Sequence, residues 1–209
     1  MTAGAPVRGV ILAGGGATRF GGEPKGLRTV GGERILDRLA RELEAALGAP
    51  PLLVANDPGA TGWRPGLRVV PDRRPGEGAL GGILTAVCEA PAPCVVVAWD
   101  MPFVTAALVR ALAGGLAHHD AMLPESDGRR GLEPLCAAYG PRCRAAIEAA
   151  LGRGDRRAIA FHGDVDVGIL PLSAVAALGD PARLFFNVNT PEDLQEAEAL
   201  WRLPGSSRS

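Results

Sequence analysis

Short apolar segments of strand length alternate with longer stretches of helical spacing along almost the whole chain. The segments 7–13 and Cys94–Ala98 are apolar and short, as is typical of strands buried on both faces. Residues 33–47 instead carry leucines and isoleucine at helical spacing, followed by Gly48 and two prolines. This alternation predicts an α/β fold: a single three-layer, Rossmann-like domain with a mostly parallel central sheet covered by helices on both faces.

The remaining segments continue the pattern. Further strands are predicted at 52–55, 67–70, 120–123, 132–139 and 184–188. Further helices are predicted at 80–89, 104–116, 142–151, 156–161 and 192–201, with Thr105 and Thr190 as caps. Pro134 interrupts one strand, which therefore lies at a sheet edge or carries a bulge. The domain is expected to span residues 1–202, with a disordered tail at 203–209.

The charge balance excludes several classes of partner. Lysine and arginine total 22 and aspartate and glutamate 23, so the formal net charge is −1. This gives no basic field for nucleic acid or an acidic membrane surface, and no segment approaches the ~20 apolar residues of a membrane span. The four cysteines form no CxxC pair and have no metal-ligand spacing with the three histidines. We therefore expect reduced thiols, no structural zinc and a cytoplasmic location.

A glycine-rich loop follows the first predicted strand and reads LAGGGATRFGGEPK from Leu12 to Lys25. Glycines such as Gly14 and Gly15 let the backbone approach an anion and turn N–H groups toward it. Arg19 and Lys25 add positive charge for phosphate. The loop has neither the GxGxxG spacing nor the Lys-Ser/Thr ending of a Walker A loop. It predicts a site for the phosphates of a nucleoside triphosphate; a flexible connection is the alternative.

Lys25 is the one lysine in a chain with 21 arginines. Where arginine has replaced lysine so widely, a retained lysine indicates a need for a compact ammonium rather than a planar guanidinium. Chance survival of one lysine is the alternative. The position of Lys25 in the glycine-rich loop argues against chance.

Polar residues also follow the other predicted strands, and they would converge with the loop at one edge of the sheet. Asp100 follows a buried strand, and a carboxylate beside a triphosphate is a natural Mg²⁺ ligand. Asn56 and Asp72 follow two further strands, and Gly78 opens a helix whose backbone could contact a base or ribose. A helix cap or plain turn is the alternative for either aspartate alone.

The segment 186–194 reads FNVNTPEDL and contains both a helix-start pattern and a pair of candidate ligand-binding asparagines. Thr190, Pro191 and Asp193 are typical of a helix start. Asn187 and Asn189 are two apart on a predicted strand and therefore point to the same side, where two amides suit a polar ligand such as a pterin. Hydrogen bonding to the strand-end backbone is the alternative for either asparagine.

Together these segments resemble the molybdenum cofactor guanylyltransferase family (MobA), whose loop pattern is similar to LAGGxxxRMGGxxKGL. The resemblance runs from about residue 10 to 201 and includes Ala-Asn at 55–56, Pro-Asp at 71–72, Asp-x-Pro at 100–102 and Asn-x-Asn-Thr-Pro-Glu-Asp at 187–193. It implies a magnesium-dependent nucleotidyltransferase that joins GMP from GTP to molybdopterin, or molybdenum-molybdopterin, and releases pyrophosphate.

The resemblance also implies roles for individual residues. GTP contacts would come from Leu12, Ala13, Gly14, Lys25, Asn56, Asp72 and Asp100. Asp100 would hold Mg²⁺, Lys25 and Arg19 would stabilise the departing pyrophosphate, and Asn187 and Asn189 would lie toward molybdopterin. Cofactor assembly proteins and target molybdoenzymes are the expected protein partners, with no nucleic acid and no membrane.

The sequence departs from the family pattern at a few positions. Asp57 stands where arginine is usual, Ala79 where proline is common, and Trp99 where cysteine is frequent. None of these changes removes a phosphate or metal group. The alternatives are a related nucleotidyltransferase with another base or acceptor, such as a molybdopterin cytidylyltransferase or a phospholactate guanylyltransferase, and a nucleotide-binding regulator without turnover.

Overall fold

The computed structural model describes residues 6–14, 24–90, 92–128 and 131–203. Within these residues, seven strands form one sheet in the order β5-β4-β1-β6-β8-β7-β9. The strands are β1 (Arg8–Ala13), β4 (Leu52–Ala55), β5 (Arg68–Val70), β6 (Cys94–Ala98), β7 (Ala121–Pro124), β8 (Cys136–Tyr139) and β9 (Val167–Leu170). A separate short hairpin joins β2 (Thr29–Val30) to β3 (Glu33–Arg34).

The sheet is mostly parallel, as predicted. β5, β4, β1 and β6 run parallel to one another, and β7 pairs in parallel with β9. Within this sheet, β8 is the described strand that pairs antiparallel, with both β6 and β7. In the pairing register Leu12 lies opposite both Val54 and Ala98, and Val54 lies opposite Val70. The carboxyl ends of four strands therefore meet at one edge of the sheet.

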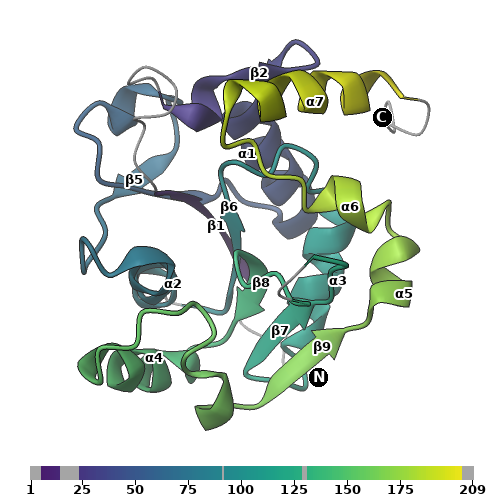
Figure 1. Cartoon of the computed structure of the whole chain (residues 1–209). Coiled ribbons are helices and arrows are strands. Elements are labelled where there is room, and N and C mark those ends of the chain that lie inside the picture. The colour runs from purple at the N-terminus through teal and green to yellow at the C-terminus, as the bar shows by residue number, and fades with distance from the viewer. Residues whose placement is uncertain (1–5, 15–23, 91, 129–130, 204–209) are drawn as a thin grey trace.

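Helices cover both faces of the sheet (Figure 1). α1, α3, α5, α6 and α7 contribute to one apolar cluster, and α2 and α4 contribute to a second cluster on the other face. Their bounds are α1 (Ile35–Leu47), α2 (Gly78–Glu89), α3 (Ala106–Gly115), α4 (Cys143–Gly152), α5 (Leu172–Ala176), α6 (Pro181–Leu184) and α7 (Pro191–Arg202). Short 3-10 turns lie at η2 (Lys25–Leu27), η3 (Ala60–Gly62) and η4 (His162–Asp164).

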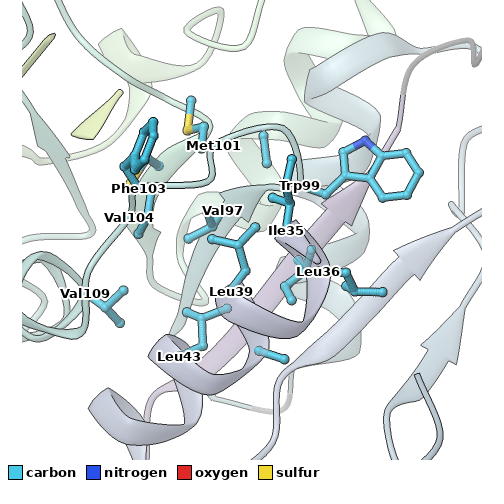
Figure 2. Close-up of a cluster of buried hydrophobic side chains, with 14 of the residues drawn as sticks. Ile35, Leu36, Leu39, Leu43, Val97, Trp99, Met101, Phe103, Val104 and Val109 are labelled. Atoms are coloured by element: carbon cyan, nitrogen blue, oxygen red, sulfur yellow. The ribbon is translucent and has the colours of Figure 1, made fainter. Parts of the chain in front are cut away.

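The helix α1 packs along one face of the sheet, with Leu43 against Gly9 near the start of β1. Its inner face presents Ile35, Leu36, Leu39 and Leu43, all fully buried, toward the sheet (Figure 2). That spacing places apolar side chains on one stripe of a helix. The helix ends at Gly48, whose φ of 76° allows its N–H to bond the carbonyl of Glu44 at 2.8 Å.

The predicted strand at 184–188 is wrong. Asp180 caps a short helix through Ala182 N, and Pro181 occupies its first turn, so α6 extends through Leu184. The following residues have no strand partner. Instead the buried Val188 donates its N–H to the carbonyl of Asp100 at 2.8 Å. The apolar run reflects burial of an irregular segment that returns to the sheet edge.

Two other predictions need correction. The segment 156–161 is not a helix but a series of turns, with bonds such as Ala160 N to Arg157 O and His162 N to Ile159 O spanning three residues. Of the two alternatives for the strand that Pro134 interrupts, the sheet edge is wrong, because β8 lies inside the sheet between β6 and β7. Pro134 precedes the paired residues, so its missing N–H costs no ladder bond.

The strand β9 was not predicted because Gly168 interrupts its apolar pattern. A Cβ at Gly168 would lie 2.2 Å from Cδ2 of His119, so glycine leaves room here for the imidazole.

The remaining expectations concern cysteines, membrane spans and the tail. All four cysteines are free, and Cys94, Cys136 and Cys143 are buried. No helix in the described part of the chain combines the length and apolarity needed to cross a lipid bilayer. The predicted tail starts at Leu203, which caps α7, and its residues 204–209 lie outside the described residues.

Truncation of Leu39 tests the contribution of the α1 face. Leu39 is fully buried, so Leu39→Ala should lower the free energy of unfolding by about 2–5 kcal/mol in urea titrations. The control is Leu203→Ala, at a residue that is 54% exposed, which should change it by less than about 0.5 kcal/mol. Equal effects of the two changes would contradict this packing.

Candidate active site

Three polar side chains from distant parts of the sequence meet beside the carboxyl end of β6. Lys25 Nζ donates a hydrogen bond to Asn189 Oδ1 at 2.7 Å and lies 3.6 Å from Asp100 Oδ2. Lys25 is only 7% exposed. A buried ammonium requires polar or charged partners, which the amide oxygen and the carboxylate provide. The predicted convergence of Lys25 and Asp100 is therefore present, and Asn189 joins them.

The carboxylate of Asp100 is largely buried and has few hydrogen-bond partners among the described residues. Burial raises the pKa of this carboxyl above its ordinary value, and the charge of Lys25 opposes the rise. The Oδ1 atom is buried and has no hydrogen-bond partner among the described residues. An unpaired buried carboxylate oxygen is costly in a folded protein. Such an atom is suited to a cation or another ligand that completes its bonding.

An aromatic pair lies next to Lys25. The ring of Trp99 stacks on Trp63, with 5.2 Å between ring centroids and 21° between planes. Trp99 also covers Gly26, where an added Cβ would lie 2.4 Å from Trp99 Cε3. The lysine therefore sits on a turn that fits closely against an indole, and the sequence alone did not indicate the roles of Gly26 and Trp63.

A second polar group lies at the ends of β4 and β5. Asn56 Oδ1 accepts the N–H of Asp72 at 2.8 Å and so joins the two strand ends. Asp72 Oδ1 accepts from the backbone N–H of Arg74 at 3.0 Å and from the hydroxyl of the buried Thr85 at 2.7 Å. Both side chains hold the loop that leads into α2, so the turn interpretation accounts for these contacts of Asp72.

The start of α2 has a backbone that only glycine adopts readily. Gly78 has a φ of 65°. One turn later, a Cβ at Gly81 would lie 3.0 Å from the carbonyl of Arg74. The helix N-terminus therefore presents bare backbone between Asp72 and the end of β1.

The glycine-rich loop is described only at its two ends. Leu12 and Ala13 close β1, and the carbonyl of Leu12 accepts the N–H of Trp99 at 3.2 Å, which fixes the two strand ends side by side. A Cβ at Gly14 would meet none of the described residues within 4 Å. Gly15 and Arg19 lie outside the described residues.

The two asparagines do not behave as the predicted pair on a strand. Asn187 Nδ2 donates to the carbonyl of Phe185 at 2.8 Å, whereas Asn189 contacts Lys25. The segment between α6 and α7 is irregular, so spacing by two does not align their side chains. Thr190 and Asp193 form the predicted capping box at the start of α7.

A cavity of about 310 Å³ lies at the opposite end of the sheet. Its lining includes His119, Asp166 and Arg142, which stand before β7, before β9 and after β8. Polar groups of this cavity contact one another, with His119 Nδ1 3.0 Å from Asp166 Oδ2 and Arg142 Nη1 3.7 Å from Asp120 Oδ1. Ligands of parallel α/β sheets bind at the carboxyl ends of strands, and the unpaired Asp100 oxygen lies there. We therefore place the candidate active site at Lys25 and Asp100.

The fit of Gly26 against Trp99 can be measured by substitution. Gly26→Ala should lower the free energy of unfolding by about 1–3 kcal/mol in urea titrations because the new methyl group overlaps the indole. The cost should shrink in a Trp99→Leu background, as a double-mutant cycle would show. Gly114→Ala in α3, where a Cβ meets nothing within 4 Å, is the matched control and should be neutral or stabilising. An equal cost in both backgrounds would contradict the contact.

Comparison with known proteins identifies the family of this chain. The family model of the MobA-like NTP transferase domain matches residues 9–166. A probable molybdenum cofactor guanylyltransferase of Pelotomaculum thermopropionicum is 39% identical over 193 residues, covering 92% of each chain. A molybdenum cofactor guanylyltransferase of Nitrobacter hamburgensis is 35% identical over 207 residues, covering 96% of this chain and 97% of that protein. The crystal structure of molybdopterin-guanine dinucleotide biosynthesis protein A from Archaeoglobus fulgidus superimposes with a TM-score of 0.76 at 28% identity, covering 93% of this chain and 98% of that one. The chain therefore belongs to the family of MobA-like NTP transferases.

Proposed function

We propose that this protein transfers GMP from GTP to molybdopterin, or molybdenum-molybdopterin, and releases pyrophosphate. The observation that carries the proposal is the buried ammonium of Lys25 beside a carboxylate with an unpaired oxygen, at the strand ends of a nucleotidyltransferase fold. The names of the two relatives compared above support guanine as the base and the molybdenum cofactor as the acceptor.

A divalent cation fits the chemistry of Asp100. Its Oδ1 is a buried carboxylate oxygen without a partner among the described residues, and hard cations such as Mg²⁺ prefer oxygen ligands. The described residues include no group of three or more histidine, cysteine, aspartate or glutamate side chains that could enclose a metal. This supports a cation held by Asp100 together with substrate phosphates, which is the usual arrangement for Mg²⁺. When bound, the cation would neutralise phosphate charge.

The proposed reaction is an in-line displacement at the α-phosphorus of GTP. An oxygen of the molybdopterin phosphate forms the new bond to that phosphorus, and the bond to the bridging oxygen of the β-phosphate breaks. The acceptor phosphate is already ionised, so no general base is required. Lys25, Arg19 and the backbone N–H groups of the loop would stabilise the negative charge that develops on pyrophosphate.

The groups at the ends of β4 and β5 would bind the nucleoside. Asn56 and Asp72 hold each other and the loop before α2 in place. A Cβ at Gly78 would meet none of the described residues within 4 Å, which supports a place there for a flat ring or a sugar. The contacts of Asn56 and Asp72 support a role in holding the backbone that would bind the nucleoside.

Substitution of Asp100 separates folding from turnover. Asp100→Asn keeps the shape of the side chain but removes its charge, so GMP transfer should fall on the order of 100-fold or more while thermal unfolding changes little. The measurement is pyrophosphate release from GTP with molybdopterin and titrated Mg²⁺, and Asp127→Asn, at an exposed aspartate, is the matched control. An Asp100→Asn enzyme with wild-type rates and wild-type magnesium dependence would rule out this role.

The base and acceptor are tested by a panel of substrates. Pyrophosphate release should be fastest with GTP among the four nucleoside triphosphates and should require molybdopterin. Release with CTP would instead identify a cytidylyltransferase, release with GTP and phospholactate a different acceptor, and nucleotide binding without release a regulator. Any of these three results would contradict the proposed function.

Exchange of the only lysine tests the need for an ammonium. Lys25→Arg keeps the charge but places a larger planar group in a site where the side chain is 7% exposed, so turnover should fall. The control is Arg110→Lys, which exchanges the same two residue types at an exposed position on α3. Wild-type rates for Lys25→Arg in the same assay would mean that the position does not require a compact ammonium.

A further inference from the structure

The capped start of α7 fixes the residue that contacts Lys25. Asp193 Oδ2 accepts the backbone N–H of Asn189 at 2.8 Å and that of Thr190 at 2.8 Å. On the other side of Asn189, the fully buried Val188 bonds the carbonyl of Asp100. The backbone at Asn189 is therefore attached to α7 directly and to Asp100 through Val188.

The side chain of Asn189, whose backbone is fixed in this way, binds the ammonium of Lys25. Its Oδ1 accepts from Lys25 Nζ at 2.7 Å, whereas Asp100 Oδ2 is 3.6 Å from the same nitrogen. A lysine has four rotatable bonds, so a carboxylate 3.6 Å away leaves its ammonium several positions to occupy. A neutral amide oxygen holds the ammonium without cancelling its charge. The positive charge and the Asp100 oxygen both stay available to a ligand.

The same helix also contacts the segment that carries Lys25. The hairpin β2–β3 follows η2 directly, and Figure 1 shows α7 lying beside β2. Gly31 N donates to Glu198 Oε1 at 2.9 Å, and the guanidinium of Arg38 lies 3.8 Å from the ring centre of Trp201. The hairpin and Asn189 are thus fixed relative to one another by α7.

We propose that Asn189 is a positioning residue that holds the ammonium of Lys25, and that Asp193 acts through Asn189 from the start of α7. The effect on turnover rests on the proposed function, but the effect on the lysine does not. A contact of Asn189 with the acceptor, as the family resemblance implies, is a different role and gives a different result below.

The single lysine makes the inference directly measurable. Protein labelled with ¹³C at the lysine ε-carbon carries one labelled side chain, so NMR relaxation of that signal in the ligand-free protein reports the order of Lys25 alone. The signal should be ordered in the wild type and mobile in Asn189→Ala. In Asp193→Ala it should be more mobile than in the wild type, because the backbone of Asn189 loses its acceptor.

Two control variants distinguish positioning from a general loosening of α7. Thr190→Ala removes the hydroxyl that caps Asp193 N but leaves both N–H bonds to Asp193 Oδ2 in place. Gln195→Ala removes an exposed amide from the same helix. Both should keep the lysine ordered. An ordered lysine in Asn189→Ala, or equal mobility in Thr190→Ala and Asp193→Ala, would overturn the inference.

Steady-state kinetics provide the second readout. In Asn189→Ala, kcat for GMP transfer should fall on the order of 10- to 100-fold, with little change in KM for molybdopterin, because the lysine is misplaced while the acceptor still binds normally. A raised KM for molybdopterin with an ordered lysine would assign Asn189 to the acceptor and overturn the inference. If no nucleoside triphosphate is turned over, the proposed function fails, and the NMR comparison still decides the role of Asn189.

Discussion

The burial of one ammonium beside one carboxylate determines how the strand ends of this protein are built. Lys25 is held between Asn189 and Asp100, and each of these three residues comes from a different part of the chain. A charge pair of this kind is not an efficient source of stability, because both ions lose solvation. Its cost is acceptable at a site where a ligand supplies the missing partners, and the unpaired Oδ1 of Asp100 marks where such a ligand would bind.

The surrounding fold keeps this pair in place with rigid elements. β1 and β6 lie side by side in the sheet, and the buried stripe of α1 packs beneath them. The Trp63–Trp99 stack fills the space next to Gly26, so the turn that carries Lys25 has a fixed support. α7 starts at the same edge of the sheet. It contacts the hairpin after Lys25 through Glu198, and it contacts Asn189 through Asp193. Sites placed on supports of this kind hold their geometry without ligand.

Much of this arrangement could be predicted from the sequence. Apolar runs of strand length locate β1, β4, β5 and β6, and the parallel topology then brings Gly14, Asn56, Asp72 and Asp100 to one edge. The partner of Lys25 could not be predicted, because Asn189 is 164 residues away and its direction depends on an irregular segment. The apolar run at 184–188 suggested a strand, but burial alone does not specify a ladder, and Val188 pairs with Asp100 instead. Likewise β9 could not be predicted, because Gly168 interrupts its apolar pattern and leaves room for the side chain of His119.

A crystal structure with GTP and Mn²⁺ tests this site most directly, because the anomalous scattering of manganese locates the metal. The manganese should lie on Oδ1 of Asp100, with the phosphates of GTP in contact with the ammonium of Lys25 and with the backbone after β1. A triphosphate bound elsewhere, or a manganese ion away from Asp100 with Oδ1 still unpaired, would contradict the claim that this edge of the sheet is the site of nucleotidyl transfer.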